Sequence, residues 1–298
     1  MPVRKSHLLI AVAVVMDIFL VLQGSALAET LLERGTYLMR SIVACGTCHT
    51  PKDVKGDLPG MELAGGFRIK GPVFNVVIRN ITPDKETGIG AWTDKQIIRA
   101  IQQGIRADGK IIGPPMPIEF YRDMSDRDVK AIVAYLRRVK PIRNEEEESV
   151  WKIPLPKSYG PPVGSVPEVP RTDKIRYGEY LVRIGRCLDC HTPLVKGHRD
   201  FKRQLGAGGF PLGDPWGLTF SANITQDKET GIGKWTDRQI KLAITNGQRA
   251  NGEKMFAPIP FPYYANLKPE DLDAIVAYLR TLKPVRKKRE VRHIPPKK

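Results

Sequence analysis

Apolar residues recur at helical spacing in two separate parts of the chain. Residues 31–44 and 174–186 carry leucine, tyrosine and valine at this spacing. Further along, "SDRDVKAIVAYLRRV" (residues 125–139) and "KPEDLDAIVAYLRTL" (residues 268–282) have the same period. A period near 3.6 residues predicts amphipathic helices. Because no alternating run of useful length predicts a strand, we expect an all-α fold with long irregular connections.

Two further short helices are predicted from their ends. Thr93 and Thr236 are each followed three residues later by glutamine, which is the capping-box signature of a helix start. Gly104 and Gly247 stand where a glycine would end these helices. Every predicted helix therefore occurs twice along the chain.

The two parts are copies of one sequence. Residues 80–110, "NITPDKETGIGAWTDKQIIRAIQQGIRADGK", match residues 223–253 at 21 of 31 positions with a constant offset of 143. The same offset relates "AIVAYLR" at residues 131–137 to its second occurrence at residues 274–280. A match of this length indicates a tandem duplication.

The duplication divides the chain into segments. We expect an acidic and Pro-rich linker between the copies, without a packed element of its own and with a solvated charge run at residues 145–148. The C-terminal tail is expected to be disordered, or to dock on the other repeat or on a partner. The predicted segments are a signal peptide at 1–28, a first repeat at 29–143, the linker at 144–170, a second repeat at 171–285 and a basic tail at 286–298.

The N-terminus has the form of a secretory signal. Arg4 and Lys5 precede an apolar run from residue 8 to residue 22, and the small-x-small sequence at residues 26–28 predicts cleavage after Ala28. The run is short for a membrane span and contains Asp17, although an uncleaved anchor remains the alternative. We therefore expect export to the periplasm.

Composition adds two constraints. The 298 residues, 41% of them hydrophobic, suit about two compact domains, each with a modest core. The formal net charge of +16 suits an acidic protein partner. No helix-turn-helix or aromatic-interleaved basic stripe occurs, so nucleic acid is not an expected partner.

All four cysteines fall in two Cys-x-x-Cys-His units. This spacing is the attachment signature of c-type haem, in which two thiols add to the vinyl groups and the adjacent histidine binds iron as the proximal ligand. We therefore predict two covalently bound haems c. The units are Cys45, Cys48 and His49 in the first repeat, and Cys187, Cys190 and His191 in the second.

Other roles for the cysteines explain less of the pattern. A disulfide in each repeat would leave the two histidines unexplained, and a thioredoxin-like redox motif needs a βαβ setting that the pattern does not predict. Zinc would need further ligands, and the remaining histidines are only His7, His198 and His293.

A methionine opposite the histidine would complete the iron coordination and suit electron transfer. In the first repeat Met116, between Pro115 and Pro117 in a stiff loop, is the preferred candidate. Met61, in a Gly-rich loop, and Met124, directly before a helix cap, are its competitors.

The second repeat departs from the first at this point. Ile259 stands at the position that corresponds to Met116. After Cys187 the chain contains one methionine, Met255, four residues before Ile259, and we assign it as the ligand of the second iron. A pentacoordinate or otherwise ligated iron remains the alternative, although His198 lies close to the haem motif and His293 lies in the tail.

Several further residues are candidates for the edge of the haem. Trp92 and Trp235 lie in the duplicated block, and an indole N–H could bond a haem propionate. Arg68, Arg106 and Arg249 could offset the charge of a propionate. A surface or core role explains each of them equally well.

These motifs resemble those of a known family. The Cys-x-x-Cys-His units, the Pro-Met-Pro loop and the Asn-Ile-Thr…Thr-Gly-Ile-Gly-x-Trp-Thr-Asp block are similar to those of cytochrome c domains in bacterial membrane-bound alcohol and sugar-acid dehydrogenases and in related dihaem cytochromes. The resemblance covers nearly all of residues 30–143 and 172–285, and it implies two class I cytochrome c-type domains. It implies His49, Met116 and His191 as iron ligands, but it does not extend to Ile259.

The resemblance also implies a function. Such subunits pass electrons from a dehydrogenase toward quinone or a terminal oxidase, although they typically carry three haem motifs and this chain has two. We therefore predict a periplasmic dihaem cytochrome c that relays single electrons from a dehydrogenase to an acceptor cytochrome or oxidase, with an acidic docking face on the partner. No catalytic constellation is visible in the sequence. The alternatives are a dihaem peroxidase-like enzyme with one open haem, a haem-based ligand sensor, and oxidation of a small inorganic donor such as thiosulfate.

Overall fold

The structure is a computed structural model that describes residues 28–53, 55–71, 73–214, 217–255, 260–287 and 293–294. Residues 31–298 form one compact unit. The predicted signal peptide lies outside the described residues, apart from residue 28. In the described part of the chain, no helix has both the length and the apolar character that a membrane crossing requires.

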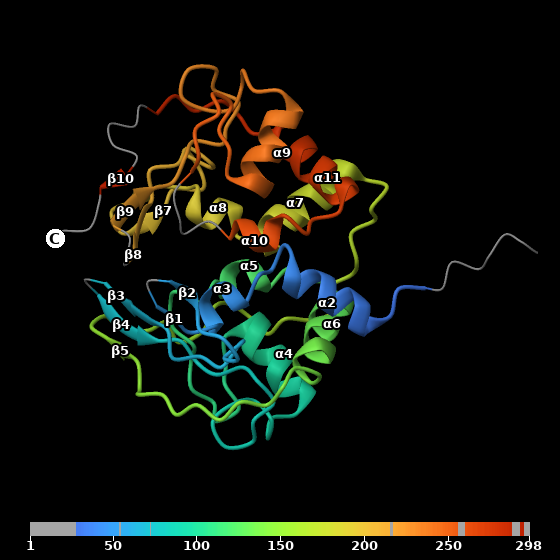
Figure 1. The fold of residues 1–298 in the computed structure, drawn as a ribbon, viewed down its shortest axis with the longest axis vertical. Coiled ribbons are helices and arrows are strands. Elements are labelled where there is room, and N and C mark those ends of the chain that lie inside the picture. Colours follow the sequence, from blue (N-terminus) through green and yellow to red (C-terminus); the bar gives the residue numbers. More distant parts are fainter. Residues whose placement is uncertain are drawn as a thin grey trace, which may run out of the picture. The chain divides into compact units, whose positions relative to one another are not determined.

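The described helices occur in the same order in each repeat, as Figure 1 shows from blue to green and from yellow to red. The predicted capping boxes are present at Thr93 and Thr236, and Gly104 and Gly247 end these helices in the left-handed conformation. In the first repeat the helices are α2 (Leu31–Arg40), α3 (Gly46–His49), α4 (Asp94–Gln103), α5 (Ile118–Tyr121) and α6 (Asp126–Leu136). In the second they are α7 (Lys174–Ile184), α8 (Cys187–Cys190), α9 (Asp237–Asn246), α10 (Phe261–Tyr264) and α11 (Pro269–Leu279).

Short antiparallel strands accompany the helices in both repeats. The first repeat has a two-stranded sheet of β1 (Lys52–Asp53) and β2 (Gly56–Asp57), and a three-stranded sheet in the order β3 (Arg68–Lys70), β4 (Phe74–Val77), β5 (Val150–Trp151). The second repeat has β6 (Leu194–Val195) with β7 (His198–Arg199), and a sheet in the order β10 (His293–Ile294), β9 (Gly217–Phe220), β8 (Pro211–Asp214).

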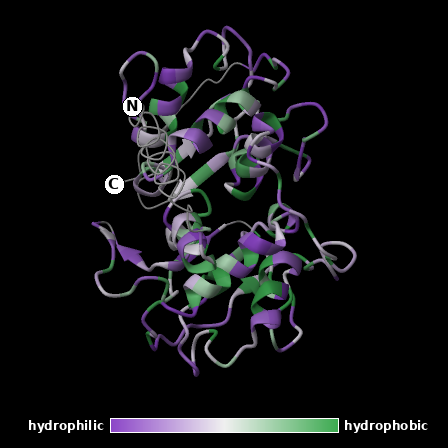
Figure 2. Cartoon of the chain, turned by 90° about the vertical axis from the view of Figure 1, so that its right-hand side faces the viewer, coloured by the Kyte–Doolittle hydropathy of each residue, from purple (hydrophilic) through white to green (hydrophobic). Residues whose placement is uncertain are grey.

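The predicted all-α fold class is therefore wrong. Of the described residues, 31% are helical and 12% lie in strands or bridges, so the fold is mixed α and β. The strands contain two to four residues each, which is too short for an alternating pattern to register in the sequence. Figure 2 shows the hydrophobic positions mainly on the helices and the hydrophilic positions along the outer loops.

Each repeat is built on a close crossing of its first and last long helices. A Cβ atom on Gly35 of α2 would lie 1.9 Å from the carbonyl oxygen of Ala131 in α6. A Cβ atom on Gly178 of α7 would lie equally close to the carbonyl oxygen of Ala274 in α11. Only glycine permits this approach at either position. The crossings fix α3 and α8, which follow α2 and α7 along the chain and carry the haem motifs.

The duplicated Asn-Ile-Thr block is tied to the end of each repeat. The buried Asn80 donates through its side-chain amide to the carbonyl oxygen of Ile142, 2.7 Å away. Asn223 makes the matching bond to the carbonyl oxygen of Val285 at 2.8 Å. In each repeat, this bond therefore holds the segment after the last helix against the Asn-Ile-Thr block.

The segments predicted as linker and tail each contain one strand. β5 pairs with β4 and β10 pairs with β9, and the two outer strands stand 143 residues apart, which is the repeat offset. Within the same stretch the indole of Trp151 donates to the carbonyl oxygen of Pro114 at 3.0 Å. The expectation that the linker holds no packed element is wrong for these residues. At His293–Ile294 the tail pairs with β9 of its own repeat, so it is neither disordered nor docked on the other repeat there.

The acidic run at residues 145–148 is not wholly solvated. The side chain of Glu146 is 2% exposed and lies 3.5 Å from the guanidinium of Arg79, whereas Glu147 and Glu148 are exposed. The expected solvated run is therefore wrong at Glu146, where the chain turns one carboxylate inward against an arginine.

Reciprocal hydrogen bonds join the two repeats. The hydroxyl of Tyr37 donates to Asp271, and the hydroxyl of Tyr180 donates to Asp128, at 2.6 Å in both cases. Each aspartate is the third residue of the last long helix of the other repeat, α11 or α6. The same hydroxyls accept from the backbone amide of the residue that precedes each helix, at 3.2 Å. Each tyrosine therefore caps the N-terminus of a helix in the other repeat.

Candidate functional site

Both Cys-x-x-Cys-His units form a single helical turn. The residue before the first cysteine has a left-handed backbone in each repeat, with φ 47° at Ala44 and 59° at Arg186. The amide of His49 then donates to the carbonyl oxygen of Cys45 at 2.9 Å, and the second unit has the same bond at 2.8 Å. This turn places both cysteines and the histidine of a unit on one short helix.

A backbone carbonyl orients each histidine. Nδ1 of His49 lies 2.7 Å from the carbonyl oxygen of Arg79, and Nδ1 of His191 lies 2.7 Å from that of Ala222. Because a carbonyl oxygen can only accept, Nδ1 carries the proton and Nε2 keeps its lone pair. Burial lowers the pKa of His49, so its imidazole stays neutral. A neutral imidazole held through one nitrogen is the form that binds a metal through the other.

Cysteines of both units are largely shielded from water. No disulfide joins them, and burial raises the pKa of Cys45 and of Cys187 to about 12. A redox-active Cys-x-x-Cys motif needs the opposite, a thiol with a lowered pKa. The raised pKa values therefore do not favour the thioredoxin-type alternative.

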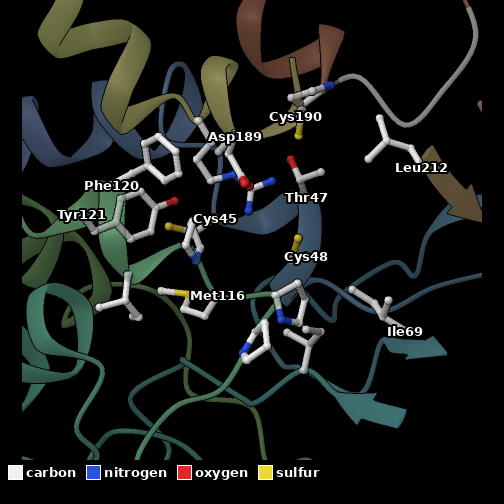
Figure 3. Close-up of a pocket in the computed structure, with 18 of the residues that line it drawn as sticks. Cys45, Thr47, Cys48, Ile69, Met116, Phe120, Tyr121, Asp189, Cys190 and Leu212 are labelled. Carbon is white, nitrogen blue, oxygen red and sulfur yellow. The ribbon is translucent and has the colours of Figure 1, made fainter. Parts of the chain in front are cut away.

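Both units line one cavity of about 3160 Å³ with a mostly apolar wall. This volume exceeds that of an ordinary small-molecule pocket, roughly 300–1,000 Å³, and leaves room for a large cofactor. Figure 3 shows Cys45, Cys48 and Met116 of the first repeat around one part of it, with Asp189 and Cys190 of the second repeat close by. Two thiols, an oriented imidazole and an apolar wall in each repeat fit a covalently bound haem c.

Met116, the predicted ligand of the first iron, lies in the wall of this cavity. It is partly buried, lines the cavity and packs against the core. Met124 also borders the cavity, but its side chain is 0% exposed. Met61 is not among the lining residues. Of these three methionines, Met116 alone combines accessible surface with a place in the cavity wall.

Met255 reaches the same cavity by another route. Its amide donates to the carbonyl oxygen of Gly247 at 2.7 Å, and it lines the wall. The corresponding position in the first repeat is Ile112, whose amide makes the matching bond to Gly104 at 2.7 Å. Ile259, which corresponds to Met116, belongs to residues 256–259 and lies outside the described part of the chain.

Comparison with known proteins agrees with this geometry. The sequence profile of the family described as "Cytochrome c" matches residues 176–283. The profile described as "Cytochrome C oxidase, cbb3-type, subunit III" matches residues 30–136. The chain carries two cytochrome c domains. The covalent cofactor that the motifs predict is therefore haem c.

Relatives with both domains are known. The cytochrome c subunit of a quinone alcohol dehydrogenase from Gluconacetobacter polyoxogenes is 31% identical over 301 residues, which cover 90% of this chain and 60% of the relative. The fructose dehydrogenase cytochrome subunit of Gluconobacter japonicus is 33% identical, with coverages of 84% and 52%. A "Diheme cytochrome c-type" protein of Cereibacter sphaeroides is 28% identical, with coverages of 79% and 81%. The chain thus spans only about half to three-fifths of the dehydrogenase subunits.

The tryptophans and arginines that were predicted to lie at the edge of each haem line the cavity. Trp92 and Trp235 stand at matching positions in its wall. Arg68 pairs with an exposed glutamate, and Arg106 and Arg249 also have acidic partners. The contact of these residues with a propionate stays a prediction.

Sequence reasoning missed other lining residues. Tyr121 and Tyr264, at matching positions, border the haem motifs, and burial raises the pKa of both hydroxyls. Arg186 stands where the first domain has Ala44, directly before the first cysteine. Comparison of the two copies at this position is the signal that could have identified it.

Glu146 makes the stability of the first domain depend on pH. Burial raises its pKa from the usual 4.5 to about 7. Between these values the unfolded chain has lost this proton and the folded chain retains it, so stability falls as the pH rises. We expect a loss of about 3 kcal/mol from pH 4.5 to pH 7.

Chemical unfolding across this pH range measures the effect. The Glu146→Gln variant should show a flatter pH dependence than the unmodified protein. Glu147→Gln, which changes an exposed neighbour, is the matched control and should keep the original slope. Equal slopes in all three proteins would show that Glu146 does not titrate in this window.

Proposed function

We propose that the protein relays single electrons from a dehydrogenase to a respiratory acceptor through two covalently attached haems c. The carrying observation is the occurrence, in both domains, of a Cys-x-x-Cys-His turn whose histidine is fixed by a backbone carbonyl and faces a shared apolar cavity. A bound haem c supplies a one-electron iron couple. The chain supplies attachment, ligation and exclusion of water.

The positions of the residues support a role for each. Two cysteines in each domain would hold the group covalently, and His49 and His191 would offer Nε2 to iron. Met116 is the proposed second protein ligand in the first domain, and Met255 is its proposed counterpart in the second. A thioether opposite an imidazole raises the reduction potential and closes the iron to small ligands, which suits electron transfer.

The partner is proposed from the relatives and from charge. The relatives named as cytochrome subunits of alcohol and fructose dehydrogenases support a dehydrogenase as the electron donor. The net charge of +16 supports an acidic docking face on that donor or on the acceptor. The N-terminal sequence supports export to the periplasm.

Anaerobic reduction by purified membrane-bound dehydrogenases tests the relay. We expect reduction of both haems, with a rate that falls steeply as salt is added, because salt screens the attraction between opposite charges. Mass spectrometry of the mature chain should show two covalent haem additions. Failure of every such dehydrogenase to reduce either haem would contradict the proposed function.

A peroxidase-like enzyme with one open haem is the second candidate, because the second domain has Ile259 in place of Met116. The Met255→Ala variant distinguishes the electron relay from the peroxidase-like enzyme. If Met255 is the ligand, the variant should lower the potential of the second haem, alter its absorption spectrum and let it bind carbon monoxide, while the first haem stays unchanged.

Met61→Ala is the matched control, since Met61 is not among the residues that line the cavity. Strong carbon monoxide binding at the second haem of the unmodified protein would favour the open-haem enzyme. An unchanged spectrum in Met255→Ala would show that Met255 only packs against the wall.

A further inference from the structure

The two domains differ in charge at two positions around the haem motif, where Arg186 and Asp189 replace Ala44 and Thr47 of the first domain. Arg186 precedes Cys187, and its counterpart Ala44 precedes Cys45. Both residues have the same left-handed backbone conformation. The arginine therefore adds a long cationic side chain without changing the turn that presents the cysteines.

The side chain of Arg186 lies within electrostatic range of both haem motifs. Its neighbours include Cys48 of the first domain and Cys190 and Asp189 of the second. Arg186 is partly buried and belongs to the wall of the cavity that both domains share. One cation thus borders two attachment sites.

The nearby carboxylate does not cancel this charge. Asp189 already accepts from Nε and Nη2 of Arg199, at 3.1 and 2.8 Å. Asp189 is thus already paired with Arg199, and the three side chains together carry a net charge of +1. The carboxylates of a haem are carried at the edge away from the attached vinyl groups, so they too stand apart from the cysteines.

We propose that Arg186 is a cation shared by the two haem sites and raises the reduction potential of both. Reduction adds one negative charge at each iron, and a partly buried positive charge nearby stabilises the reduced state more than a fully solvated one would. The proposal rests on the electron-relay function and deepens it. Both potentials would then move together when this single side chain is changed.

Potentiometric titration of holoprotein variants tests the proposal. In Arg186→Met, we expect the ratio of ferrous to ferric iron at a fixed ambient potential to fall roughly tenfold at each haem, the size of a unit charge acting across a partly screened protein interior. Arg186→Lys keeps the charge and should retain most of both potentials. Arg176→Met removes the same charge from an exposed position of α7 and should change neither.

Three results of this titration would each lead to a different conclusion about Arg186. Mass spectrometry confirms that each variant carries two haems before its potentials are compared. Unchanged potentials in Arg186→Met, or a shift no larger than that of Arg176→Met, would overturn the proposal. A shift at one haem alone would overturn the shared role. Dithionite and mediators reduce the haems here, so failure of a dehydrogenase to donate electrons would contradict the relay and leave this result intact.

Discussion

Replacing Asp128 by alanine is expected to lower the free energy of unfolding by about 3–5 kcal/mol, the cost of leaving a buried charge without its partner. Arg34 donates to Asp128 through Nε at 2.7 Å and Nη2 at 2.9 Å, and the two side chains are 4% and 3% exposed. Tyr180 loses its acceptor in the same variant. One substitution therefore disturbs the core of the first domain and its contact with the second.

Urea unfolding of the holoprotein measures this loss. The matched control is Asp94→Ala, which removes an exposed partner of Arg137 and should cost at most about 1 kcal/mol. The double variant Arg34→Met/Asp128→Leu should recover most of the lost stability, because an apolar pair replaces the buried ion pair without leaving a lone charge. A loss in Asp128→Ala no greater than in the control would show that the pair contributes little.

The second large effect is expected at the cysteines. Replacing Cys187 and Cys190 together by serine should halve the pyridine haemochrome absorbance per chain, because the second domain can no longer form its thioether bonds. The apolar wall of that domain then loses the group that fills it, and we expect its thermal unfolding to separate from that of the first domain.

The corresponding pair in the first domain, Cys45 and Cys48, provides the control. Its replacement by serine should give the same halving and destabilise the other domain instead. Removal of all four thiols should leave no covalent haem. Two haem masses on the chain that lacks Cys187 and Cys190 would contradict the predicted attachment sites.

The sequence predicted the features that depend on local chemistry. The capping boxes at Thr93 and Thr236 and the haem motifs are encoded within a few residues, and the structure contains these helix starts. The strands were not predicted, because each contains only two to four residues and its pairing depends on a segment elsewhere in the sequence. β5 depends on β4, which lies more than 70 residues earlier in the chain.

The candidate site can be divided into residues that local sequence predicts and residues that it does not. Cysteine and histidine spacing predicted the attachment residues, and proline context predicted Met116 as a ligand. Nothing local marks Glu146 as the one buried member of an acidic run, because Arg79, its partner, is 67 residues away. Arg186 could have been found only by asking why one copy of the motif carries a charge that the other lacks.

The reciprocal contacts of Tyr37 with Asp271 and of Tyr180 with Asp128 have a consequence for how the duplicated chain arose. Contacts in which residue i of one copy meets residue j of the other, and the reverse, are those of an isologous interface with two-fold symmetry. A homodimer of a single repeat would already possess both bonds before any fusion. Once both copies are in one chain, a residue can change in one copy and not in the other. The corresponding positions Arg34 and Tyr177, and Ala44 and Arg186, differ in this way.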